Sequence, residues 1–219
     1  MTYGKISIQA SVEMKSSPLL CRVIFASGRR RSFPPKSRQN PSDKPLCYFY
    51  QLDYPGEEWK IAPHLLWKAQ LVNPLMPMEA VVSMRGYLVT LNDYGEVGYN
   101  NAVSIYDPRG RLIRTYALDE LLPAQERNEV VHSTSSRWWN LKAKYYFTEH
   151  PGRFYVVLQS GKALEFNLAN GNFIFGAAAR FIELDKLQKK PSAGEYTEIW
   201  QTSLRFSSIT DVLQAQKPR

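Results

Sequence analysis

The chain has 219 residues, of which 44% are apolar and 22% charged, a composition typical of a globular protein with one substantial domain. No apolar run reaches the roughly 18–20 residues that a membrane-spanning helix requires, so no membrane span is predicted. The net charge of +8 lies mostly in residues 1–45, which hold nine of the 28 Lys and Arg residues but two of the 20 acids. Because nucleic-acid-binding domains usually carry basic residues over the folded body, nucleic acid is not a favoured partner.

Residues 1–45 are predicted to form a basic, disordered N-terminal arm ahead of a β domain at 46–219. The stretch 26–45 is rich in Arg, Ser and Pro and has little apolar surface to offset the entropy cost of ordering. Upstream, the apolar patch "SSPLLCRVIFASG" (16–28) fits either a remnant of a secretion signal or an isolated edge strand. A basic arm is also the part of the chain through which nucleic acid or an anionic membrane would be contacted.

Cys21 and Cys47 are the only cysteines, and neither belongs to a CxxC motif or a paired histidine spacing. We therefore expect two buried thiols rather than a zinc site. A disulfide between them is the alternative if the chain is exported. The chain also lacks a P-loop, a dinucleotide fingerprint and an HExxH motif, so no cofactor, no metal and no catalytic residue are predicted from motifs.

From Leu46 onward, short runs of β-branched and aromatic residues alternate with turn residues. Strands are expected at residues 46–53, 65–72, 78–83, 86–93, 101–107, 111–118, 143–149, 153–159, 162–168 and 172–177. The sequence Asp-Pro-Arg-Gly at 107–110 predicts a tight turn. Short helices are expected at 119–129, with Asp119 as the N-cap, and at 180–190 and 207–216. This pattern predicts an all-β antiparallel fold, as a sandwich, barrel or propeller-like arrangement.

Two parts of the chain resemble each other. The strand "GYLVTLND" (86–93) is similar to "GRFYVVLQ" (152–159), and each is followed by a second strand, a glycine turn and a third strand. From the first glycine to the turn glycine the first unit spans 24 residues (86 to 110) and the second 19 (152 to 171). The extra length lies in "YGEVGYNN" (94–101), where the second unit has a tight "SGK" turn. The loop at 92–101 is thus an enlarged hairpin connection.

The run from Leu66 to Pro123, with "LVNP", "VSIYDPRG" and "LDELLP", and the segment "HSTSSRWW" (132–139) resemble a family of uncharacterised bacterial proteins with propeller-like β repeats. The resemblance covers about residues 46–175. It implies a propeller-like β domain and export, and it brings no established activity. Ten strands make two to three blades, so the sheet is expected to remain a partial propeller, to pack as a sandwich, or to close by homodimerisation.

The loop 92–101 offers side-chain oxygen atoms from Asn92, Asp93, Glu96, Asn100 and Asn101. Calcium usually takes six to eight oxygens including several carboxylates, and this loop has only two. Hairpin turn chemistry explains the same residues, because Asn and Gly tolerate left-handed backbone conformations. We therefore favour a wide turn, with a cation site and a partner-binding loop as the alternatives.

The segment "HSTSSRWW" combines His132, Arg137 and two tryptophans. If it is extended, Trp138 and Trp139 point to opposite faces, so one is expected in the core and the other at the surface. An exposed tryptophan beside an arginine suits a binding surface. Serine hydrolase chemistry would need a histidine, an oriented acid and an oxyanion hole at one serine, and no G-x-S-x-G motif is present.

The function that these observations favour is a non-enzymatic binding or scaffold module whose partner is a protein or a small ligand. The alternative is a hydrolase or metal-assisted enzyme that uses the 92–101 loop and His132. The candidate residues of the binding surface are Asn92, Asp93, Tyr94, Glu96, Tyr99, Asn100, His132, Arg137, Trp138 and Trp139.

Overall fold

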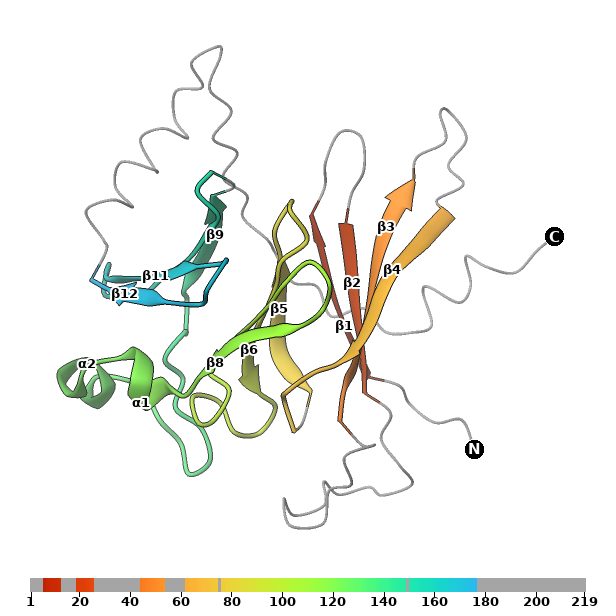
Figure 1. The fold of residues 1–219 in the computed structure, drawn as a ribbon. Coiled ribbons are helices and arrows are strands. Elements are labelled where there is room, and N and C mark those ends of the chain that lie inside the picture. The colour runs from red at the N-terminus through yellow and green to blue at the C-terminus, as the bar shows by residue number, and fades with distance from the viewer. Residues whose placement is uncertain are drawn as a thin grey trace, which may run out of the picture.

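The computed structural model describes residues 6–12, 19–25, 44–53, 62–74, 76–148 and 150–176. They form three four-stranded antiparallel sheets and two short helices (Figure 1). The prediction of an all-β antiparallel fold is therefore confirmed, and the sheets of the described residues do not close into a ring. In this part of the chain no helix has the length and apolar character needed to cross a bilayer. The helices expected at 180–190 and 207–216 lie outside the described residues.

The first sheet contains two strands from the range that was assigned to a disordered arm. Its strands, hydrogen-bonded in chain order, are β1 (Ile6–Val12), β2 (Leu19–Phe25), β3 (Leu46–Asp53) and β4 (Ala62–Gln70). β2 pairs with β3 from Leu19 opposite Gln51 to Ile24 opposite Leu46, and β1 pairs with β2. Both segments are rich in residues that favour strands, and pairing satisfies their backbone groups. The arm prediction is therefore corrected for β1. For β2 the strand alternative given for residues 16–28 holds, but the strand lies inside the sheet and not at its edge, and 26–43 lies outside the described residues.

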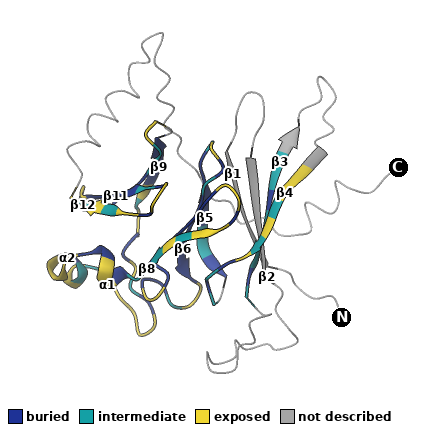
Figure 2. Cartoon of the chain, in the orientation of Figure 1, coloured by how far each residue is buried: buried dark blue, intermediate teal, exposed yellow. Residues whose placement is uncertain are grey.

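The second sheet is covered on both faces. Its strands are β5 (Pro77–Val82), β6 (Leu88–Asp93), β7 (Val103–Tyr106) and β8 (Leu112–Tyr116). Every residue of β6 and β7 is buried (Figure 2). Since successive side chains of a strand point to opposite faces, both faces of these strands must be packed. The edge strand β8 instead alternates between exposed and partly covered positions.

The third sheet repeats the arrangement of the second. Its strands are β9 (Lys144–Thr148), β10 (Arg153–Val157), β11 (Ala163–Asn167) and β12 (Phe173–Phe175). All ten strands expected from residue 46 onward are present, with ends that differ by at most three residues. The hydrophobic period of two was a sufficient signal for these strands.

Two hydrophobic cores hold the sheets face to face. The two cores lie on opposite faces of the second sheet, as the adjacent residues Val81 and Val82 of β5 show. Val81 belongs to the core shared with the third sheet, and Val82 belongs to the core shared with the first sheet. The larger core brings in Phe154 and Phe166, and in the smaller one Phe49 stacks on Trp67 with 4.8 Å between ring centroids. Full burial of one such side chain contributes about 1.5–3 kcal/mol. The order of the sheets therefore follows from the side chains that the central sheet presents on its two faces.

The tight turn predicted at 107–110 is present. Asp107 Oδ1 accepts hydrogen bonds from the backbone nitrogens of Arg109 (2.8 Å) and Arg111 (2.9 Å), and Gly110 has a φ of +77°. A Cβ at Gly110 would lie 2.7 Å from a ring carbon of Trp67. This turn of the second sheet therefore packs directly against β4 of the first sheet and requires glycine for space as well as for conformation.

The helical segment after β8 is divided into α1 (Leu118–Leu121) and α2 (Ala124–Asn128). The N-cap of α1 is Ala117, not Asp119 as expected, and the Ala117 backbone nitrogen donates a hydrogen bond to Glu120 Oε2 (2.7 Å). Asp119 lies in the first turn, where its carboxylate pairs with arginines. The capping interaction thus comes from the acid three residues after the N-cap.

The strands reverse at two ends of the molecule that differ in character. At one end lie the hairpin turns 83–87, 107–111 and 150–153. At the other, which we call the loop-bearing end, lie the loop 92–101, the connection 117–143 with both helices, and the turn 158–162 (Figure 1). The loop-bearing end carries all the candidate residues of the sequence analysis.

Candidate functional site

The loop 92–101 is organised by the side chain of Asn92. Its backbone is left-handed (φ +58°), as are Gly95 (φ +78°) and Gly98 (φ +74°). Asn92 Oδ1 accepts hydrogen bonds from the Gly98 backbone nitrogen (3.0 Å) and from Trp139 Nε1 (2.7 Å), and its Nδ2 donates to Asn140 Oδ1 (3.0 Å). The turn chemistry predicted for Asn and Gly is therefore confirmed, and Asn92 also ties the loop to a segment 47 residues away.

Asp93 is a buried structural carboxylate. It is only 1% exposed, and its Oδ1 and Oδ2 accept hydrogen bonds from Asn73 Nδ2 and Asn101 Nδ2, both at 2.8 Å. Asn73 in turn accepts from Thr90, and Asn101 accepts from Thr115. This network provides hydrogen bonds for both carboxyl oxygens of Asp93, which would be costly to bury without partners. Within the described residues no group of three or more His, Cys, Asp or Glu side chains is arranged to hold a metal ion.

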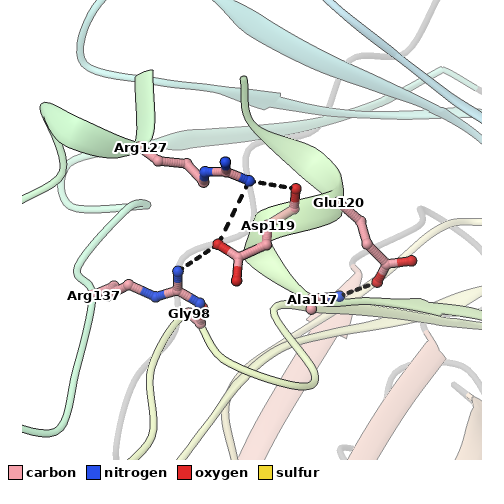
Figure 3. Close-up of polar contacts among 6 residues, drawn as sticks. All are labelled: Gly98, Ala117, Asp119, Glu120, Arg127 and Arg137. Atoms are coloured by element: carbon pink, nitrogen blue, oxygen red, sulfur yellow. Dashed lines mark hydrogen bonds and ion pairs between the residues drawn. The ribbon is translucent and has the colours of Figure 1, made fainter. Parts of the chain in front are cut away.

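Arg137 locks the loop 92–101 to α1. Its backbone nitrogen donates to the Val97 carbonyl oxygen (2.8 Å), and its guanidinium donates to the Gly98 carbonyl oxygen and to Asp119 Oδ1 (2.6 Å) (Figure 3). The guanidinium also lies 4.5 Å from the centre of the Tyr99 ring, at cation–π distance. A Cβ at Gly98 would lie 2.6 Å from the Arg137 carbonyl oxygen. The loop 92–101 and the backbone at Arg137 therefore approach each other so closely that only glycine fits at position 98.

Asp119 is the anion at the centre of this arrangement. Figure 3 shows the Asp119 carboxylate approached by Arg127 of α2 and by Arg137 of the segment that follows α2. The hydrogen bond from Arg137, together with the charges of both arginines, holds the pKa of Asp119 below its ordinary value. Because the Asp119 side chain is 60% exposed, solvent screens these pairs and each contributes little to stability. Their main effect is to position Arg137.

The two tryptophans lie on opposite sides of their segment, as predicted. Trp139 is buried, with 5% exposed and its indole nitrogen bonded to Asn92. Trp138 is 38% exposed, and its backbone nitrogen donates to the Val131 carbonyl oxygen (2.7 Å). The neighbours of Trp138 on both sides are thus anchored, so the exposed ring projects from a fixed backbone.

The other candidates are distributed unevenly. Tyr94, Tyr99, Asn100 and His132 are exposed at the loop-bearing end, whereas Glu96 is half-buried. His132 Nδ1 lies 3.1 Å from the Val130 carbonyl oxygen, so its one described side-chain contact is within its own segment.

The catalytic alternative would require an acid of the loop and His132 to meet. The carboxylate of Asp93 is instead directed at Asn73 and Asn101 in the interior. Neither of the two pockets described below is lined by Asp93, Glu96 or His132.

A groove at the loop-bearing end was not foreseen from the sequence. It has a volume of about 340 Å³ and brings together residues of α2, the 130–141 segment and the β10–β11 turn. We call it the Trp138 groove; the lining residues that matter most are Glu126, Glu129, Val131, Trp138, Leu141 and Leu158. An ion pair between Lys162 and Glu126 ties α2 to the turn. Apolar Val131 and Leu141 in an irregular segment were the signal available in the sequence.

A second pocket, of about 520 Å³, lies at the opposite end beside the 107–111 turn. Arg109 and Arg111 line it, and Arg111 Nε donates to Asp107 Oδ2 (2.6 Å). Hydrogen bonds within this turn, opposed by partial burial, leave the pKa of Asp107 below its ordinary value. Both oxygens of the Asp107 carboxylate thus accept hydrogen bonds within the turn.

Sequence reasoning also missed a buried polar cluster between the second and third sheets. Asn140 Nδ2 donates to Glu79 Oε1 (2.9 Å) and to the Tyr145 hydroxyl (2.8 Å). Burial raises the pKa of the Glu79 carboxyl, and it raises the pKa of the Tyr145 hydroxyl as well. Glu79 lies 61 residues from Asn140 in the chain, so no local motif links it to Asn140 and Tyr145.

Comparisons with known proteins add no family to this geometry. No family model matches the chain, and no match is found among the curated proteins or the solved structures. The function must therefore be argued from the site itself.

Proposed function

We propose that the chain is a non-enzymatic binding or scaffold module of propeller-like type, and that its loop-bearing end is the binding surface. The propeller-like part of the proposal is supported by three consecutive four-stranded antiparallel sheets stacked through two cores, with β1 lying against β5. It is also supported by equivalent turn glycines, Gly110 and Gly171, which share a φ of +77°. A closed ring needs at least about four blades, so further blades would come from outside the described strands.

The binding part of the proposal is carried by one observation: exposed aromatic rings project from a backbone that buried contacts hold in place. Trp138 lies between Arg137, which is bonded to the 92–101 loop, and Trp139, which is bonded to Asn92. Tyr99 is held by the Arg137 guanidinium and stays 38% exposed. Pre-organised aromatic side chains next to arginine are typical of residues that dominate binding energy, because little entropy is lost when a partner docks.

No observation in the described residues favours the hydrolase or metal-assisted alternative. The Asp93 carboxyl group is used structurally, and the His132 ring contacts the Val130 carbonyl oxygen of its own segment. Binding is thus the function that the contacts of this end support best, with a protein segment or a small ligand as the partner.

The proposal is tested by selecting peptides from a display library on the immobilised full-length chain. Dissociation constants of the enriched peptides are then measured for the wild type, Trp138→Ser, Tyr99→Ser and the control Ile174→Ser. Ile174 is a matched control because it is 58% exposed on β12. We expect losses of at least about tenfold for Trp138→Ser or Tyr99→Ser and no change for the control. Absence of enrichment, or peptides that bind both variants as tightly as the wild type, contradicts the proposal.

A further inference from the structure

We propose that the Trp138 groove takes a chain segment in which apolar side chains stand next to Lys or Arg. This inference rests on the proposed binding function and adds the chemistry of the partner. It follows from two features of the groove, its apolar surface and its charge.

The apolar surface is concentrated. Val131, Trp138 and Leu141 are 61%, 38% and 48% exposed and all line the groove. Beneath them, Leu158 and Trp139 are buried and give the groove a floor that is already packed. Contiguous exposed apolar side chains with a polar rim mark interaction sites on protein surfaces. A volume of about 340 Å³ is at the small end of ligand pockets, so it suits a few side chains of a segment rather than a domain.

The charge of the lining has one sign. Glu126 and Glu129 are its charged side chains, and no lysine or arginine lines it. Glu126 is paired with Lys162, so the exposed Glu129 is the carboxylate that would contact a basic side chain of the partner. Most of the net charge of +8 lies in residues 1–45, and the rest of the chain is nearly neutral, so the acidic side chains of the lining set the local charge at the groove. Such complementarity selects a cationic partner and disfavours an acidic one of equal hydrophobicity.

The inference is tested with two fluorescent peptides of about ten residues, one alternating Leu with Lys and one alternating Leu with Glu, titrated against the full-length chain. We expect the Leu/Lys peptide to bind and the Leu/Glu peptide to bind at least about tenfold more weakly. Glu129→Gln should weaken the Leu/Lys complex about threefold, as for a partly exposed ion pair. Leu141→Ser should weaken it about tenfold.

Matched controls separate the groove from general effects. Glu120→Gln removes one exposed carboxylate that does not line the groove, and glutamine can keep the hydrogen bond from the Ala117 nitrogen. Ile174→Ser removes one exposed apolar side chain elsewhere, and neither variant should change the affinity. Circular dichroism verifies that each variant is folded. Binding of neither peptide, equal binding of both, or equal effects of Glu129→Gln and Glu120→Gln overturns the inference.

Failure of the inference is distinguishable from failure of the proposed function. If display-selected peptides need Trp138 or Tyr99 but are unaffected by Glu129→Gln and Leu141→Ser, the binding module stands and the assigned partner chemistry is wrong. If no selected peptide depends on Trp138 or Tyr99, both fail.

Discussion

Replacing Asn92 by alanine is expected to be among the most destabilising changes at the loop-bearing end. The substitution deletes hydrogen bonds to the Gly98 nitrogen, Trp139 Nε1 and Asn140 Oδ1, all of them buried. Each buried donor that loses its acceptor costs about 1–3 kcal/mol. Alanine in the left-handed region, where Asn92 has a φ of +58°, adds about 1–2 kcal/mol.

Two donors, Gly98 N and Trp139 Nε1, lose their acceptor, so with the backbone cost the combined loss is about 3–8 kcal/mol. This is a large part of the roughly 5–15 kcal/mol that stabilises a typical domain. It is measured as the change in free energy of unfolding from urea titrations monitored by far-UV circular dichroism. Asn92→Gly separates the contributions, because it deletes the hydrogen bonds but keeps the left-handed backbone accessible and should be less damaging by about 1 kcal/mol.

Asn100→Ala is the matched control. Asn100 is an exposed asparagine of the same loop, so its replacement should change the free energy of unfolding by less than about 0.5 kcal/mol. If Asn92→Ala is as mild as Asn100→Ala, Asn92 does not organise the loop, and the rigid presentation of Trp138 loses its basis.

Three further predictions concern the same region. Gly98→Ala places a Cβ 2.6 Å from the Arg137 carbonyl oxygen, whereas a Cβ at Gly95 meets open space at a similar φ. Urea denaturation should therefore show Gly98→Ala to be less stable than Gly95→Ala by at least about 1 kcal/mol, and equal losses would contradict this. Burial raises the pKa of Glu79, so its contribution to stability is fully present below the unfolded value of 4.5 and is lost as pH rises through the folded pKa. Glu79→Gln should therefore gain stability over the wild type from about pH 4 to about pH 7, and a difference independent of pH refutes it. The lowered pKa of Asp119 acts in the opposite sense, because its stabilisation is present above the unfolded value of 3.8 and is lost as pH falls through the folded pKa. Asp119→Asn should thus destabilise the protein at about pH 7 in low salt but not in about 1 M salt; a deficit that persists in high salt argues against ion pairing.

The strands from residue 46 onward were predictable because their signal is local. Alternation of apolar residues and turn glycines identifies each strand and hairpin without knowledge of its neighbours. β1 was missed, and β2 was only one of two alternatives for residues 16–28, because basic and proline-rich residues follow them in the sequence. Their place in the first sheet depends on pairing with β3, which lies across a long connection.

The features of the candidate site likewise differ in whether local sequence rules predict them. The left-handed residues of the loop 92–101 and the opposed tryptophans follow from local rules, and both are as predicted. The burial of Asp93 does not, because one of its two hydrogen-bond donors, Asn73, precedes β5 and reaches the carboxylate only once the second sheet has formed. The sequence hinted at the Trp138 groove only through the apolar Val131 and Leu141 in an irregular segment, since its walls come from segments that only tertiary packing brings together.

The central claim is that the loop-bearing end is a rigid surface built to receive a partner. Amide hydrogen exchange of the full-length chain, with and without a display-selected peptide, tests it most directly. The claim predicts that the amides of Gly98, Arg137 and Trp138, which are hydrogen-bonded within loops, already exchange slowly in the free chain. It also predicts that the peptide adds protection at 130–141 and not at the 107–111 turn. Fast exchange at these three amides, or protection gained at the opposite end, would contradict the account.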